Sequence, residues 1–225
     1  GAFNKFDKAK HYGEIIWAEY ASVPNVHRYY ENTSFKTDFN VFAKTAWSPI
    51  EALTLYADMQ YRAITYKCNG IESHLEPVAI RETFHFFNPK VGISYRIRPG
   101  TVYVSYSVAH REPIRDDYID AVTGEKPKPE MLGNLEAGIR KAGHNHQYAM
   151  NYYLMNYRNQ LVLTGAINDD GQYVRKNAGK SYRTGVELSG GYKPAKILEI
   201  AGNLSLSINK TNYKQEGDEG QLMNY

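Results

Sequence analysis

The sequence predicts an all-β protein, an antiparallel up-and-down meander of about nine strands. The first supporting observation is alternation within segments. In TVYVSYSVAH at 101–110, Val102 and Val104 fall on one face of an extended strand, and Ser105 and Ser107 fall on the other. The second observation is that tight turns and long polar loops follow such segments in strict alternation along the chain.

The composition agrees with strands that are apolar on one face only. Tyr occurs 20 times and the mean hydropathy is −0.57. The net charge of +3, from 27 Lys and Arg against 24 Asp and Glu, is too balanced for a nucleic-acid partner, so we expect none. The single Cys68 excludes an internal disulfide framework and a cysteine metal cluster. No apolar run reaches the roughly 18 residues of a transmembrane helix, although barrel strands would show no such run.

Nine segments of the chain carry the strand pattern. The longest of them places Leu53 and Leu55 on one face and Thr54 and Arg62 on the other. The predicted strands are His11–Ser22, Phe35–Trp47, Ala52–Lys67, Phe84–Arg98, Thr101–His110, Gly133–Lys141, His146–Arg158, Ser181–Lys193 and Ile197–Asn209. In this arrangement one surface of the sheet should collect Leu53, Leu55, Val102, Val104, Leu204 and Leu206.

The connections differ in length according to the end of the sheet on which they fall. Short turns are expected at 48–51, 99–100, 142–145 and 194–196, and long polar loops at 23–34, 68–83, 111–132 and 159–180. The last of these loops has room for short rim strands, and a polar tail follows 209. Outer-membrane barrels sort their connections in this way, whereas a soluble meander would do so only by accident. Because bacterial barrels have an even number of strands, we expect residues 1–225 to be one segment of the wall of a larger outer-membrane β-barrel.

Seven pieces of the sequence, in order, resemble the C-terminal barrel of TonB-dependent outer-membrane receptors. They are YYENTSFKTDFNVFAKTAWSPIEALTLYADMQYR, FNPKVGISYRI, VYVSYSVAHREPIRDDYID, KPEMLGNLEAGIR, YYLMNYRNQLVLTG, NAGKSYRTGVELSGGY and LSLSINKTNY. The resemblance covers roughly residues 11–213. Any single piece, such as the K-P-E segment, is weakly specific, whereas the full series is strongly so.

The resemblance implies a plugged barrel of the roughly 22-stranded class, which imports a scarce nutrient. The implied partners are outer-membrane lipid, an N-terminal plug domain, a TonB-type energy-coupling protein and a small-molecule ligand. That ligand could be an iron chelate, cobalamin, haem or an oligosaccharide. Residues 1–225 contain neither the plug nor the energy-coupling box nor the final strands of the family, so we do not expect this segment to transport by itself.

Three other functions compete with energy-coupled uptake. A passive porin-like channel would share the barrel but need no plug. A soluble β-rich carbohydrate-binding or adhesion module would share the strand pattern but need no membrane. An outer-membrane enzyme would need a catalytic group of residues facing the lumen or rim, and none stands out. We therefore expect no catalytic residue, no cofactor and no bound metal.

The loop Arg111–Leu132 is the predicted ligand-handling part of the chain. It follows the clearest strand and lies on the long-loop end. Charged donors and acceptors and one aromatic ring fall together in Arg111, Arg115, Asp116, Asp117 and Tyr118. The competing interpretation is a solvated loop that shields the barrel mouth.

Other candidate sites have simpler explanations. The Asp116-Asp117 and Asp169-Asp170 pairs are more typical of solvated loops than of an acid–base dyad, because neighbouring side chains on a strand point to opposite faces. His144 and His146 could hold a metal, but the short turn offers no third ligand. Haem-importing relatives carry FRAP and NPNL motifs in the region where this chain has HREP and KPEM, which argues against haem.

Overall fold

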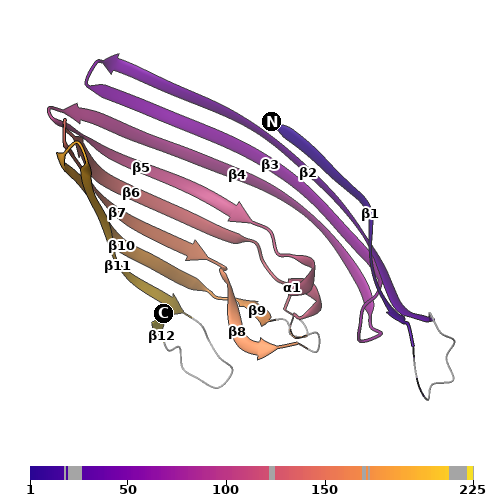
Figure 1. The fold of residues 1–225 in the computed structure, drawn as a ribbon. Coiled ribbons are helices and arrows are strands. Elements are labelled where there is room, and N and C mark those ends of the chain that lie inside the picture. Colours follow the sequence, from indigo (N-terminus) through magenta and orange to yellow (C-terminus); the bar gives the residue numbers. More distant parts are fainter. Residues whose placement is uncertain are drawn as a thin grey trace.

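The computed structural model is a single curved antiparallel sheet, drawn in Figure 1. It describes residues 1–17, 19, 27–121, 125–168, 171, 173–212 and 222–224. Nine long strands and one short strand are ordered β1-β2-β3-β4-β5-β6-β7-β10-β11-β12. Consecutive strands are therefore neighbours, apart from β8 and β9, which pair with each other as a separate hairpin. The predicted up-and-down meander is confirmed.

The strands are longer than the sequence pattern suggested. Their bounds are β1 Ala2–Ile15, β2 His27–Ile50, β3 Leu53–Ile71, β4 Pro77–Ile97, β5 Gly100–Arg111, β6 Glu130–Ala142, β7 His146–Arg158, β8 Leu161–Ile167, β9 Tyr173–Asn177, β10 Lys180–Ala195, β11 Leu198–Asn212 and β12 Leu222–Asn224. The helix α1, Arg115–Ile119, follows β5. Each predicted short turn is present within about two residues of its expected position, and the rim strands expected within 159–180 are β8 and β9.

The loops predicted at 68–83 and 23–34 are wrong in extent. β3 continues to Ile71 and β4 starts at Pro77, so only residues 72–76 connect them. The Glu72 carboxylate accepts the main-chain N–H groups of His74 and Glu76 and so closes this turn. Likewise β2 begins at His27, while residues 23–26 lie outside the described part. The error arose because the residues of 27–34 and 68–71 are mostly polar, and because the two apolar residues Val78 and Ile80 make too short an alternation to reveal a strand.

The predictions for the two ends of the chain also differ from the structure. The first strand was expected at His11–Ser22 but runs from Ala2 to Ile15, paired with β2, and most of 16–26 lies outside the described residues. The expected polar tail begins later than predicted, because β11 extends to Asn212 and β12 pairs with it. In both places the main-chain ladder, not side-chain polarity, decides how far a strand runs.

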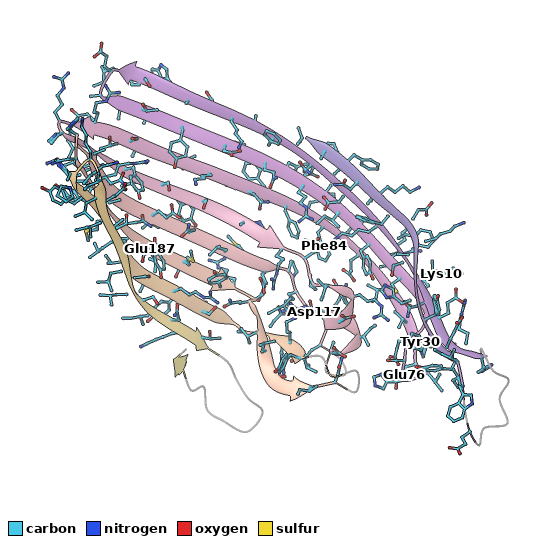
Figure 2. All side chains as sticks on the ribbon, in the orientation of Figure 1. Lys10, Tyr30, Glu76, Phe84, Asp117 and Glu187 are labelled. Atoms are coloured by element: carbon cyan, nitrogen blue, oxygen red, sulfur yellow. The ribbon has the colours of Figure 1, made fainter. Side chains whose placement is uncertain are left out.

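The register separates an apolar face from a polar face. Cross-strand partners connect Leu55 through Ile93, Val104, Ala137, Tyr152 and Val186 to Leu206. The parallel row connects Leu53 through Tyr95, Val102, Ile139, Met150 and Leu188 to Leu204, so the predicted shared surface is confirmed. This apolar face is open: Val104 is 44% and Leu206 is 63% exposed. Side chains project from both sides of the sheet (Figure 2), and α1 packs over one end of the polar face.

Tyrosine rings lie flat over glycines on the polar face. Tyr56 is the cross-strand partner of Gly92, and Tyr103 is the partner of Gly138. A Cβ atom added to Gly92 would overlap Tyr56 Cζ, and one added to Gly138 would overlap Tyr103 Oη and the Met150 main-chain oxygen. Glycine lets the tyrosine ring lie directly against the main chain of the next strand, whereas a larger residue would push the ring away from it.

A small packed core forms at the end of the sheet opposite the short turns. Cys68, Val78 and Ile80 are buried on the polar face, where Tyr118 and Ile119 of α1 pack against them. α1 and the β8–β9 hairpin lie at this same end (Figure 1). No helix among the described residues has the length and apolarity needed to cross a bilayer.

Candidate ligand-binding site on the polar face

The candidate site forms where β5 separates from β4. Pairing between the two strands runs from Ile97 opposite Gly100 to Lys90 opposite Ser107 and stops there. Beyond this point β4 stays with β3, and β5 stays with β6 as far as Arg111. The segment 112–129, of which 112–121 and 125–129 are described and which we call the α1 loop, starts from the end of β5, and its residues Tyr118 and Ile119 pack on the polar face of β3 and β4.

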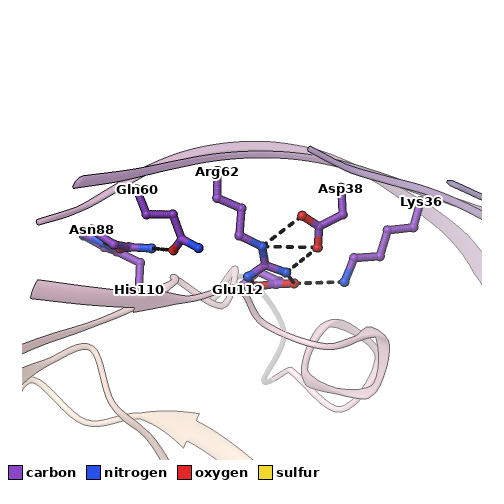
Figure 3. Close-up of polar contacts among 7 residues, drawn as sticks. All are labelled: Lys36, Asp38, Gln60, Arg62, Asn88, His110 and Glu112. Carbon is purple, nitrogen blue, oxygen red and sulfur yellow. Dashed lines mark hydrogen bonds and ion pairs between the residues drawn. The ribbon is translucent and has the colours of Figure 1, made fainter. Parts of the chain in front are cut away.

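An ion cluster attaches the start of the α1 loop to the sheet (Figure 3). The Glu112 carboxylate accepts hydrogen bonds from Lys36 Nζ at 2.9 Å and from Arg62 Nη1 and Nη2 at 3.0 and 3.1 Å. Arg62 also donates from Nε and Nη2 to Asp38, at 2.5–3.2 Å. We call these four residues the polar-face ion cluster.

The ion cluster is sheltered from water, which strengthens its interactions. The exposed fractions of its side chains are 32% for Lys36, 25% for Arg62, 15% for Asp38 and 13% for Glu112. Burial alone would raise the pKa of the Glu112 carboxyl, but the Lys36 hydrogen bond and the charges of Lys36 and Arg62 hold that pKa below its ordinary value. Glu112 is therefore an anion at neutral pH.

A second polar chain holds the end of β5 beside β4. Asn88 Nδ2 donates to Gln60 Oε1 at 3.0 Å, and Asn88 Oδ1 lies 2.9 Å from His110 Nδ1. Because Oδ1 can only accept, His110 Nδ1 carries the hydrogen. The His110 ring also stacks on Phe86 with a centroid separation of 5.1 Å. His110 thus holds β5 to β4 after their main-chain pairing has ended.

The predicted site residues divide between exposed and structural positions. Arg111 is 56% exposed and pairs with Glu130 across the β5–β6 ladder at 2.8 Å. On α1, Arg115 and the 36% exposed Asp116 pair with each other at 3.0 Å. Arg111 is therefore the most exposed of these three side chains, whereas Arg115 is only 20% exposed.

The other two predicted residues hold α1 in place. Asp117 accepts the Ile114 N–H at 2.8 Å as a helix cap and pairs with Arg175 of β9 at 3.0 Å. Burial raises the pKa of the Asp117 carboxyl, although the Ile114 N–H and Arg175 favour its charged form. Tyr118 packs on the small core, and burial raises the pKa of its hydroxyl.

The α1 loop is tied to strands on both of its sides. Towards β4, Lys126 pairs with Glu82 at 2.6 Å. Towards β9, Asn177 exchanges two hydrogen bonds with the Lys128 main chain, at 2.7 and 3.0 Å. A cavity of about 900 Å³ lies on the β4 side, lined by His74, Arg81, Glu82, Tyr118 and Lys126 among others. Another of about 600 Å³ lies on the β9 side, lined by Asp117, Asp120, Lys128, Arg175 and Asn177 among others.

Sequence reasoning missed the polar-face ion cluster. The alternation had placed Lys36 and Asp38 on one face of their strand and Arg62 on the polar face of the next. Their meeting depends on register, because Asn40 stands opposite Arg62 and thereby places Asp38 diagonally beside it. Glu112 joins them only because the α1 loop packs on this face, which no local pattern predicts.

The weaker candidate sites gain no support. Among the described residues, no group of three or more His, Cys, Asp or Glu side chains lies close enough to hold a metal. His146 instead stacks on Tyr148, and its Nδ1 lies 3.2 Å from Asn145 Oδ1. The Asp169-Asp170 pair lies outside the described residues.

Comparison with known proteins identifies the family. The family model described as "TonB dependent receptor-like, beta-barrel" matches residues 3–225. The chain belongs to this family. Its members are outer-membrane receptors and transporters, not enzymes, and the family implies a plug domain and partnership with TonB. No curated protein sequence matches the chain.

Several solved TonB-dependent receptors share the fold at low sequence identity. The ferric-catecholate import receptor Fiu from E. coli K12 superposes with a TM-score of 0.63 at 16% identity, over 85% of this chain and 31% of that one. The copper transporter OprC gives 0.64 at 16% identity, over 82% and 29%. The alcaligin receptor FauA from Bordetella pertussis gives 0.59 at 15% identity, over 80% and 31%. This chain therefore spans about a third of the length of these receptors.

Replacing Asp117 with Ala should loosen the α1 loop, because the change removes both the helix cap and the link to Arg175. A hydrogen bond to a charged group contributes about 1.5–3 kcal/mol, so the loop should open at least about tenfold more often. Cleavage after Glu125 by the glutamate-specific protease Glu-C, in the folded full-length receptor, measures this opening.

Asp116→Ala is the matched control for this experiment. Asp116 is the adjacent, more exposed carboxylate, and its ion pair is to Arg115 of its own helix. Its variant should be cleaved at the wild-type rate. Equal cleavage of the Asp117 variant and wild type would show that Asp117 does not anchor the loop.

Proposed function

We propose that residues 1–225 form a single wall segment of an outer-membrane, energy-coupled uptake receptor for a scarce ligand such as an iron chelate. The observation that carries the proposal is the contrast between the two faces of the sheet. One face is an open array of apolar side chains, and the other is polar and bears the α1 loop. A one-layer sheet of this kind is suited to lipid on one side and a water-filled lumen on the other.

The α1 loop favours a receptor over a passive channel. It is fixed by ion pairs to β2 and β3 on one side and to β9 on the other, so a folded, charged segment stands at the long-loop end of the polar face. Such a segment can supply several specific contacts to one ligand, which a receptor needs and a non-selective pore does not. The partners of the intact protein would be outer-membrane lipid, its plug domain and a TonB-type energy-coupling protein.

Within this receptor, the loop Arg111–Leu132 would handle the ligand. Arg111 and Asp116 would contact it, because they are the more exposed members of the set, and Arg115, at 20% exposure, would reach it from beside Asp116. Asp117 and Tyr118 would not contact the ligand themselves but would hold α1 in place, against β9 and the small core respectively.

A growth experiment tests the function of the whole receptor. A strain that lacks the gene for the full-length protein should lose growth on one ferric chelate supplied as the only iron source, and a plasmid copy should restore it. Uptake of that chelate should also stop when the energy-coupling protein is deleted. Uptake that persists without energy coupling would instead identify a passive channel.

Replacing both Arg111 and Arg115 with Ala in the full-length receptor should weaken ligand binding by at least about tenfold, because two charge-assisted donors are lost. Binding of the transported chelate to whole cells, at matched surface expression, measures the effect. Lys193→Ala is a suitable control, since Lys193 is 52% exposed and lies at the short-turn end. Unchanged affinity in the double variant would remove these arginines from the binding site.

Replacing Leu204 with Arg should destabilise the full-length barrel by roughly 2–4 kcal/mol if the residue sits at the bilayer midplane, and by less nearer the interfaces. Ser205→Arg is the matched control, because Ser205 is on the polar face opposite Glu187. The free energy of unfolding in liposomes, obtained from denaturant titration, separates the two. Equal losses in both variants would contradict a lipid-facing apolar surface.

A further inference from the structure

The polar-face ion cluster contains two cations from the sheet that converge on one carboxylate. Lys36 and Arg62 lie on β2 and β3, whose pairing is continuous from Asn32 opposite Gly70 to Trp47 opposite Leu55. Asp38 binds the Nε and Nη2 side of the Arg62 guanidinium and thereby orients it. The remaining donors of Arg62 and the Lys36 ammonium point at Glu112. The sheet therefore holds a preorganised cradle for a carboxylate.

The charges of the sheet residues do not balance without Glu112. Lys36 and Arg62 are positive and Asp38 is negative, so this part of the sheet carries one uncompensated positive charge. The site is sheltered, since Arg62 is only 25% and Asp38 only 15% exposed. A sheltered cation gains more from an anionic partner than an exposed one, because water screens the attraction less.

The carboxylate that supplies this balance belongs to the α1 loop and not to the sheet. Glu112 is the first residue after β5, and it stands outside every strand ladder. Its side chain can leave Lys36 and Arg62 without breaking a main-chain pair of the sheet. Another carboxylate that entered the cradle would remake the same contacts.

We propose that Lys36 and Arg62 form a binding site for a carboxylate group of an incoming ligand, and that Glu112 occupies this site as an internal substitute. The proposal rests on the proposed uptake function, because that function brings a ligand to the polar face. Ligand binding and docking of Glu112 are then mutually exclusive. A bound carboxylate frees the start of the α1 loop, so arrival of the ligand is coupled to the position of the loop.

The test uses citrate as a carboxylate probe on the full-length receptor in detergent, with affinity measured by calorimetry. Glu112→Gln keeps the size and hydrogen-bonding capacity of the side chain but removes its charge. The variant should bind citrate at least about tenfold more tightly than wild type, because the internal competitor is weakened. Raising the salt concentration should reduce the gain.

Two further variants test whether the gain in citrate affinity depends on Lys36. Adding Lys36→Gln to the Glu112→Gln variant should abolish the gain. Adding Lys44→Gln instead should leave the gain intact, because Lys44 lies on the same face of β2 but pairs with Asp58 at 3.1 Å, away from the cluster. Citrate affinity that is unchanged by Glu112→Gln, or a gain that survives Lys36→Gln, would overturn the proposal.

The result is separable from the test of the proposed function. The binding measurement needs neither energy coupling nor transport. A receptor that still imports its chelate in cells but shows no citrate gain would refute the carboxylate site alone. Loss of import with the citrate response retained would refute the uptake function and keep the site.

Discussion

The main-chain ladder of the sheet is the constraint from which the other features follow. Because side chains alternate strictly along a strand, a ladder kept in one register over the six junctions from β3 to β11 turns local alternation into two continuous surfaces. The ladder between β4 and β5 ends at Lys90 and Ser107, and beyond these residues the two strands separate. Beyond that point side chains, not main-chain hydrogen bonds, connect β5 and the α1 loop to the neighbouring strands. His110 stacks on Phe86, and Glu112 forms ion pairs with Lys36 and Arg62.

Most of the fold was predictable because it depends on short-range patterns. Alternation located the middle of each long strand except β1, whose predicted range His11–Ser22 meets only its last residues, and proline and glycine located the short turns. The rows through Leu55, Val104 and Leu206 follow from the pleat once the order of strands is known. The strand ends were not predictable: His27 to Ser34 and Cys68 to Ile71 are polar or mixed, and only pairing with a neighbouring strand makes them extended.

The candidate site was less accessible to sequence reasoning for a related reason. The predicted set Arg111, Arg115, Asp116, Asp117 and Tyr118 was chosen by proximity along the chain. The structure shows that adjacent members have opposite surroundings, with Asp116 facing solvent and Asp117 buried against Arg175. The ion cluster instead joins residues that are up to 76 positions apart. Its members carry no local signature, and only the register of β2 with β3 and the packing of the α1 loop bring them together.

The tyrosine rings that lie over Gly92 and Gly138 affect how much space is free in front of the polar face. A ring laid flat on the strand takes little of the space in front of the sheet, whereas a ring that stands upright extends into it. The absence of one methyl group at each glycine allows the flat position, since an added Cβ would meet Tyr56 or Tyr103. A change from glycine to alanine at either position would therefore push the ring outward, and the displaced ring would take more of the space in front of the sheet than the added methyl group itself.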